Sequence, residues 1–75
     1  RSGEARTIRA ITLRSRVNAA LAALTAAQRE AFVLVHLEGF SVEEAALLCG
    51  KPSGTLKSHL HRALVALREA LGELL

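Results

Sequence analysis

An all-α fold of four helices is predicted for this chain by three features of its sequence. Alanine and leucine supply 14 residues each, and both residue types favour helix. Aromatic and β-branched residues, which favour strands, are few. Apolar residues also recur at helical spacing between repeated helix-capping signals. At 75 residues, the chain has room for one small hydrophobic core.

The first helix is expected to follow a short lead-in. Residues 1–6 are interpreted as a linker or a frayed segment, because little apolar order precedes Ile8. From there, apolar residues continue at mostly helical spacing to about Leu24. We therefore assign residues 1–6 to the lead-in and residues 7–75 to a single helical domain.

Two capping boxes predict where the second and third helices begin. In "TAAQ", Thr25 can cap the second helix while the glutamine three residues later bonds back to the cap. In "SVEE", Ser41 and the second glutamate repeat this arrangement. The second helix is expected to end after Glu38 and the third at Gly50, because Gly39 and Gly50 suit the left-handed residue that follows a helix.

The last helix is expected to begin at Pro52 and Ser53 and to continue almost to the end of the chain. At about 22 residues, it would be roughly 33 Å long. Its apolar residues fall on one stripe, which is typical of a helix that packs on a core. The stripe consists of Leu56, Leu60, Ala63, Leu64, Leu67, Leu71 and Leu74.

The third and fourth helices have the proportions of a helix-turn-helix. A short first helix, a tight turn with the sequence "CGKP" and a longer second helix follow one another. The small side chains of Ala45 and Ala46 would let the two helices approach closely. Pairs of capped amphipathic helices also occur in bundles that never bind DNA, so the pattern alone leaves both interpretations open.

Polar and basic residues occupy the other side of the last helix. At about 100° per residue, Ser58 and Arg62 point almost directly away from the apolar stripe. Residues 51–68 carry four full positive charges and no acidic side chain. Arginine can bind guanine through two hydrogen bonds, and serine or threonine can bond to bases or phosphates. We interpret this face as a DNA-reading surface; the alternative is an ordinary solvated basic face. Its flanking residues are Thr55, Lys57 and His61.

Several short motifs together carry a family resemblance. They are Gln28-Arg29-Glu30, Gly39-Phe40-Ser41, Glu44-Ala45-Ala46, Gly54-Thr55, Lys57-Ser58, Arg62-Ala63 and Leu67-Arg68. A chain with these motifs in this order resembles region 4 of a bacterial sigma-70-family factor, in particular of the extracytoplasmic-function subgroup. The resemblance covers residues 17–71, which is most of the chain.

The resemblance implies a function and a set of partners. The last helix would recognise the promoter −35 element in double-stranded DNA, inside an RNA polymerase holoenzyme. The domain would also dock on the flap of the polymerase β subunit and be sequestered by an anti-sigma factor. The part of such a factor that melts the −10 region is absent from these residues, so this domain is expected to recognise a promoter without opening it.

Carried over position by position, the resemblance names the DNA-binding residues. The −35 readers would be Lys57, Ser58, His61 and Arg62, and the backbone contact would come from Ser53, Gly54 and Thr55 at the helix start, where free N–H groups favour a phosphate. Gly54 could be turn material, or it could let a DNA backbone come close. Position 59 is often arginine in this family, and His59 would make a weaker phosphate contact near neutral pH.

Other functions find little support in the sequence. Cys49 is the only cysteine, which excludes an internal disulfide, and it is expected to fill a small apolar pocket under the turn. His59 and His61 diverge on a helix and cannot share a metal ion. No aspartate and no paired carboxylates are present, so neither an enzyme nor a cofactor is expected. His36 is expected near the end of the second helix, partly buried or at its C-terminus.

The expected setting is the cytoplasm, without a membrane segment, because no apolar run approaches the roughly 20 residues that a membrane span needs. Nothing resembles a dimer seam, so a monomer is expected. Two other hypotheses remain open. A sigma-like decoy would bind an anti-sigma factor without DNA and would not need Lys57, Ser58 and Arg62 together. A LuxR-type response-regulator output domain also has four helices, but the long continuation "RALVALREAL" disfavours it.

Overall fold

The computed structural model describes residues 2–72, with side chains from residue 6 onward. Within this range the predicted all-α fold is confirmed, because every regular element is helical. None of the described helices combines the length and the apolar character needed to cross a bilayer. The elements are α1 (Ser2–Ala23), α2 (Ala26–Phe32), a π-helical turn η1 (Val33–Leu37), α3 (Val42–Cys49) and α4 (Ser53–Leu71).

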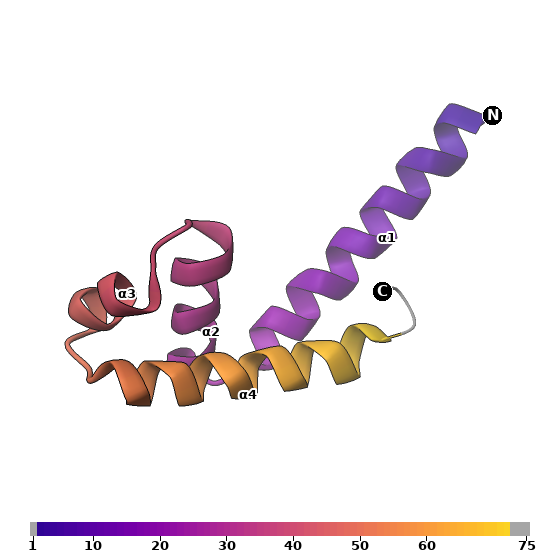
Figure 1. Ribbon diagram of the computed structural model, residues 1–75. Coiled ribbons are helices and arrows are strands. Elements are labelled where there is room, and N and C mark those ends of the chain that lie inside the picture. Colours follow the sequence, from indigo (N-terminus) through magenta and orange to yellow (C-terminus); the bar gives the residue numbers. More distant parts are fainter. Residues whose placement is uncertain (1, 73–75) are drawn as a thin grey trace.

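Helix α4 is the element on which the others are assembled (Figure 1). Helices α2 and α3 pack against its N-terminal half, and the C-terminal end of α1 packs near its middle. The rest of α1 extends away from the other helices, which gives the protein an elongated outline of 50 × 21 × 17 Å. The other helices therefore determine which side of α4 remains exposed to solvent.

The core consists of two small clusters along α4. In the first, Leu56 of α4 is 1% exposed and packs among three buried alanines of α2 and α3. In the second, Ala63 and Leu67 of α4 pack against the end of α1 through Ala20 and Leu24. Alanine at these contacts keeps the helix axes close, because interaxial distance depends on the side chains between them. The alanines around Leu56 are Ala31, Ala45 and Ala46.

Both predicted capping boxes are present. The hydroxyl of Thr25 accepts from the N–H of Gln28 at 3.2 Å, and the Gln28 side chain accepts from the N–H of Thr25. The hydroxyl of Ser41 accepts from the N–H of Glu44 at 3.0 Å, and the Glu44 carboxylate accepts in return at 2.9 Å. Each box satisfies helix N–H groups that would otherwise lack partners.

Both helix-ending glycines are also as predicted. Gly39 has φ +82° and Gly50 has φ +65°, in the left-handed region that favours glycine. Gly50 ends α3 and leads into the turn of the helix-turn-helix, where the N–H of Lys51 donates to the carbonyl of Ala46 at 3.0 Å. The turn therefore returns the chain close to α3 before α4 begins.

Arg29 joins α1 to α2. Helix α1 has no basic residue in its own last turn. The guanidinium of Arg29 reaches back from α2, where Nε donates to the carbonyl of Leu21 at 3.0 Å and Nη2 donates to that of Leu24 at 3.0 Å. Carbonyls at a helix C-terminus lack intrahelical partners and favour a cation. This contact fixes the angle at which α1 leaves the core.

The structure corrects three details of the sequence prediction. Helix α1 begins at Ser2, which is earlier than the predicted start near residue 7; the interpretation of residues 1–6 as a linker or a frayed segment stays a prediction. The second helix ends in a π-helical turn, in which the N–H of Glu38 donates to the carbonyl of Val33. Helix α4 has 19 residues and ends at Leu71, and the predicted stripe residue Leu74 lies outside the described residues.

We expect Leu56→Ala to lower the free energy of unfolding by about 2–5 kcal/mol, because truncation would leave a cavity between α2, α3 and α4. Leu60, in the middle of the predicted stripe, is only half-buried, so Leu60→Ala should cost less. Val65→Ala, at a position 38% exposed on the same helix, is the control. Thermal and urea melts of the three variants provide the measurement. Equal losses for Leu56 and Val65 would contradict this core assignment.

Candidate nucleic-acid interface

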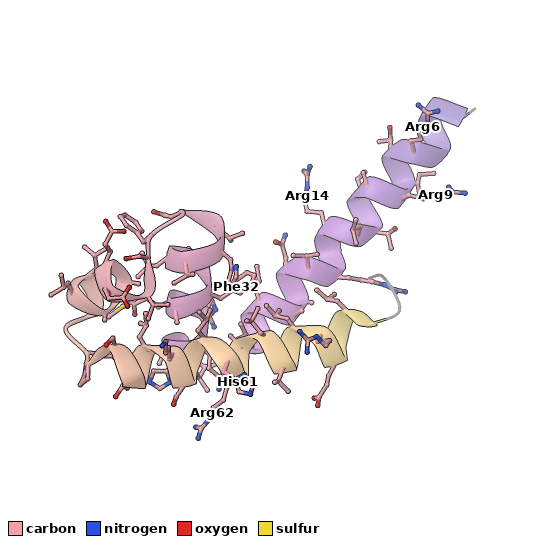
Figure 2. All side chains as sticks on the ribbon, viewed as in Figure 1. Arg6, Arg9, Arg14, Phe32, His61 and Arg62 are labelled. Carbon is pink, nitrogen blue, oxygen red and sulfur yellow. The ribbon has the colours of Figure 1, made fainter. Side chains whose placement is uncertain are left out.

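The residues predicted to bind DNA lie on the surface of α4, and Ser53 among them adjoins α3, where it lines a hollow with Glu43 and Leu47. All seven are exposed, and they lie within the first ten residues of the helix. The buried residues of α4, Leu56, Ala63 and Leu67, lie on its other side. Figure 2 shows His61 and Arg62 pointing away from α2 and from α1. The exposed set is Ser53, Gly54, Thr55, Lys57, Ser58, His61 and Arg62.

The start of α4 differs from the starts of α2 and α3. Its N-cap is Pro52, which makes no side-chain cap hydrogen bond. An α-helix leaves its first N–H groups without intrahelical partners, and proline has no side-chain acceptor for them. The N–H groups of the first turn of α4 are therefore available to a ligand outside the protein. Partial positive charge at a helix N-terminus favours an anion there.

Gly54 lies in this first turn. Its surroundings show whether the turn itself needs a glycine or whether the missing side chain leaves room for a DNA backbone. A Cβ atom built at Gly54 would meet nothing within 4 Å, and its φ is not in the left-handed region. The fold itself therefore does not require glycine at this position. The absence of a side chain instead leaves the first turn open to a close approach from outside the protein.

The first four turns of α4 carry no acidic side chain of their own, but Glu43 of α3 lines a hollow with Lys51 and Ser53 at the start of the helix. Lys57 and Arg62 carry full charges on exposed side chains, and the acidic residue of α4 that lies nearest in sequence is Glu69. The acids of α3, Glu43 and Glu44, lie in the first turn of that helix, where they complement its own dipole. The backbone N–H of Ser41 lowers the pKa of the Glu44 carboxyl, with a smaller effect from the Ser41 hydroxyl.

The arrangement can bind an anion and present specific donors at the same time. Uncapped N–H groups and Lys57 suit phosphate oxygens. Arg62 can donate two hydrogen bonds to one planar acceptor edge from its rigid, planar guanidinium. A helix with these two functions on one exposed face matches the second helix of a helix-turn-helix.

The three histidines occupy different environments. His59 is half-buried and His61 is exposed, so they lie on different sides of α4 as predicted. His36 lies at the end of η1, as predicted for a C-terminal position, but it is exposed. Its ring packs near that of Phe32, with centroids 5.3 Å apart.

Cys49 is half-buried beside the Leu56 cluster, and its thiol makes a contact that was not predicted. Its Sγ donates to Oε1 of Glu30 at 3.2 Å, which connects the end of α3 to α2. Desolvation raises the pKa of the Cys49 thiol, and the Glu30 carboxylate raises it further. A thiol held in its protonated form is a poor nucleophile, so the environment favours a structural role.

Two features of the structure were not predicted from the sequence: the contact of Arg29 with the end of α1 and the exposure of two leucines on α3. The role of Arg29 as a cap for α1 has no local sequence signal, because it depends on how two helices meet. Leu47 and Leu48 of α3 are 83% and 61% exposed. Their exposure was not anticipated from the sequence. The buried residues of α3 are only Ala45 and Ala46.

Comparison with known proteins places these observations in a family. The sequence model of the family described as "Sigma-70, region 4" matches residues 14–74. The chain is 50% identical over 52 residues to "RNA polymerase sigma-E factor" of Streptomyces antibioticus, an alignment that covers 69% of this chain and 29% of that relative. It is 53% identical over 45 residues to "ECF RNA polymerase sigma factor EcfG" of Rhodopseudomonas palustris, with 60% and 25% covered.

A third relative is also named as a sigma factor. The chain is 47% identical over 51 residues to "ECF RNA polymerase sigma factor SigC" of Mycobacterium tuberculosis, covering 68% of this chain and 28% of that relative. The chain thus spans less than a third of the length of these relatives. The residues matched by the family model, 14–74, include the helix-turn-helix and its exposed basic face.

Proposed function

Because the chain belongs to the sigma-70 region 4 family, we propose that α4 reads the −35 element of promoter DNA for a sigma factor that directs RNA polymerase. The observation that carries this proposal is the exposed, acid-free face of α4 opposite its buried stripe. The relatives' names support the sigma-factor setting. They do not support a LuxR-type output domain.

The residues divide into two roles. Arg62, at the centre of the face, would bind a guanine through two hydrogen bonds, while Lys57, Ser58 and His61 contact neighbouring base edges. The first turn, from Ser53 to Thr55, would hold a backbone phosphate on its free N–H groups. Phosphate contacts set the register of the helix in the groove, and base contacts supply the sequence preference.

The isolated domain should bind DNA weakly and as a monomer. A single recognition helix is one module, which buries roughly 600–1,000 Å² of protein surface. Its few cations give mainly salt-sensitive attraction, with non-specific dissociation constants on the order of 10⁻⁴ to 10⁻⁶ M at physiological salt. Useful affinity would come from the polymerase, because a tethered domain acts at high effective concentration beside a second promoter contact.

Docking on the β-subunit flap and capture by an anti-sigma factor complete the proposal. Both need apolar surface that the fold leaves uncovered, and the described helices provide it at Leu37, Leu47 and Leu48. Exposed apolar side chains that form a contiguous patch mark protein–protein contact sites. A sigma-like decoy would share these surfaces but would not bind the −35 duplex, so direct DNA binding separates the two functions.

We expect Arg62→Ala to cost about 1–3 kcal/mol of specific binding and to relax the preference at one base pair. Arg68→Ala is the matched control, since Arg68 is also exposed on α4 but lies beyond the reading turns. The preferred duplex is first selected from a randomised pool with the wild-type domain. Binding is then titrated on that duplex and on single-base variants. If Arg62→Ala weakens every duplex equally, Arg62 is a phosphate contact and not a base reader.

We expect Gly54→Ala to stabilise the free domain by about 0.5–1 kcal/mol, because alanine favours helix and its Cβ meets nothing. The same change should weaken binding to all duplexes by a similar factor, because the Cβ would meet an approaching phosphate backbone. Gly72→Ala makes the same replacement at the other end of α4, also with nothing within 4 Å, and should leave DNA binding unchanged. Undiminished DNA affinity in Gly54→Ala would show that no backbone comes close there.

A further inference from the structure

Lys51 lies in the turn between α3 and α4 and was not among the residues predicted to bind DNA. It lines a hollow of about 310 Å³ whose other lining residues come from both helices of the helix-turn-helix. From α4 comes Ser53, one of the proposed phosphate contacts, and from α3 come Glu43, Ala46 and Leu47. The hollow therefore adjoins the start of the proposed reading helix.

The backbone at Lys51 is fixed on both sides. Its N–H donates to the carbonyl of Ala46 at 3.0 Å, which ties the turn to α3. The next residue is Pro52, whose ring restricts its φ, here −62°. The carbonyl of Pro52 accepts from the N–H of Leu56 at 3.1 Å, which ties the turn to the buried residue of α4. The side chain of Lys51 is therefore carried by a rigid frame that is continuous with both helices.

The fold does not use the two opposite charges in the hollow. The carboxylate of the neighbouring Glu44 is held in the capping box by the N–H of Ser41, whereas Glu43 makes no hydrogen bond or ion pair among the described residues. The Lys51 ammonium makes no ion pair within that part of the chain either. Opposite charges near solvent attract each other only weakly, so an anion from outside can compete with Glu43 for Lys51.

DNA would supply such an anion beside the turn. In a helix-turn-helix, the second helix lies in the major groove while the first helix crosses the sugar-phosphate backbone. The turn that joins them therefore lies close to backbone phosphates. Phosphate and sugar oxygens take at least half of all protein–DNA hydrogen bonds, and lysine binds a phosphate as a point charge.

We propose that Lys51 binds a phosphate of the promoter backbone, and that Glu43 competes with this phosphate for the Lys51 ammonium. The inference rests on the proposed function, since it places Lys51 on the same DNA that α4 reads. A phosphate contact carries no direct sequence information. The pair therefore sets how strongly the domain holds any duplex, and it leaves the base preference to α4.

Lys51→Gln tests the phosphate contact. The variant is titrated at about 50 and 200 mM salt on the selected −35 duplex and on its single-base variants. Loss of one phosphate contact lowers the slope of log K against log salt by about 0.9, so the loss of affinity should be about 3.5-fold greater at the lower salt concentration. We expect the same loss on every duplex. An unchanged slope, or a loss confined to one base pair, overturns the proposal.

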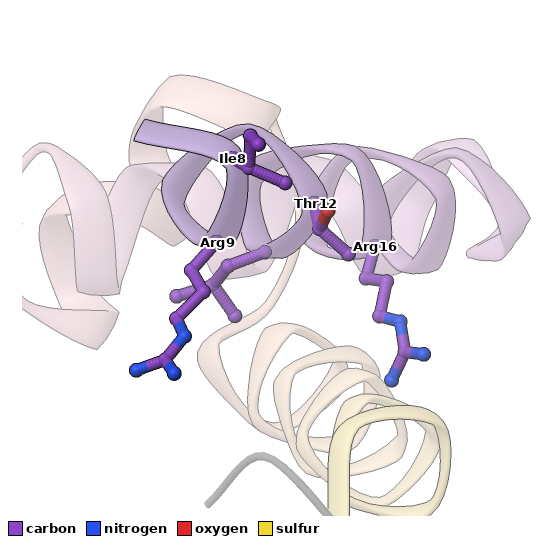
Figure 3. A pocket seen from close by; sticks show the side chains of 5 residues that line it. Ile8, Arg9, Thr12 and Arg16 are labelled. Carbon is purple, nitrogen blue, oxygen red and sulfur yellow. The ribbon is translucent and has the colours of Figure 1, made fainter. Parts of the chain in front are cut away.

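Arg9→Gln is the matched charge control. Arg9 is also exposed and lines a hollow, but that hollow lies on α1 and includes Ile8 and Arg16 (Figure 3). Figure 2 shows Arg9 and Arg62 in different parts of the molecule, pointing in different directions. Both variants lose one positive charge, so an effect of net charge alone would be equal in the two. We expect Arg9→Gln to keep the wild-type salt slope, and equal changes in both variants would contradict a contact at Lys51.

Glu43→Gln tests the competition. We expect it to raise the affinity for every duplex by about two- to fivefold, the size of an exposed ion pair. In the Lys51→Gln background the gain should be much smaller, because the two side chains act on one another. Glu38→Gln makes the same charge change at an exposed position outside the hollow and is the control. Circular dichroism melts check that all variants fold. An equal gain with and without Lys51 overturns the competition.

The outcomes separate this inference from the proposed function. If Arg62→Ala loses base preference while Lys51→Gln behaves like Arg9→Gln, α4 reads DNA without Lys51 and this inference fails alone. If the wild-type chain binds duplexes without any base preference, the proposed function fails, and the salt slope of Lys51→Gln still decides whether Lys51 meets a phosphate. A wild-type chain that binds no duplex overturns both.

Discussion

Leu56 is the largest side chain that the described residues bury completely, and it packs against alanines of two other helices. This contact fixes α4 at one rotation about its axis relative to α2 and α3. Because α4 is a single straight element, that rotation determines which of its residues face outward. Lys57, Ser58 and Arg62 keep the orientation that the proposed DNA reading needs only as long as Leu56 stays in its site. The stability of the core and the orientation of the proposed DNA face therefore depend on the same packing.

A second constraint acts on the other end of the molecule. The guanidinium of Arg29 holds the last carbonyls of α1, while Ala20 and Leu24 pack on Ala63 and Leu67 of α4. These contacts anchor the end of α1, and none of them involves residues 6–16. Stability is thus distributed unevenly, high around Leu56 and low in the N-terminal part of α1.

Capping and turn patterns within a few residues predicted most helix boundaries correctly. The boundaries and contacts that were not predicted have no such local pattern. Thr25, Ser41, Gly39 and Gly50 were assigned correctly because caps and left-handed residues act within a few positions. The family resemblance and the all-α class were confirmed. The early start of α1 was not predicted, since residues 2–6 have little apolar order to indicate a helix. The π-helical turn also escaped prediction, because it forms where the chain must bring Phe40 to the Leu56 cluster. The DNA-binding residues are exposed as predicted, but their roles remain proposals.

The central claim is that the outward face of α4 is the surface that meets promoter DNA. Backbone amide signals of the ¹⁵N-labelled chain, recorded while the selected −35 duplex is added, test it most directly. If α4 reads DNA, the signals of residues 53–62 shift and saturate together, and those of residues 6–16 in α1 stay in place. Saturating shifts confined to residues 6–16, or to α3 without α4, would contradict the claim.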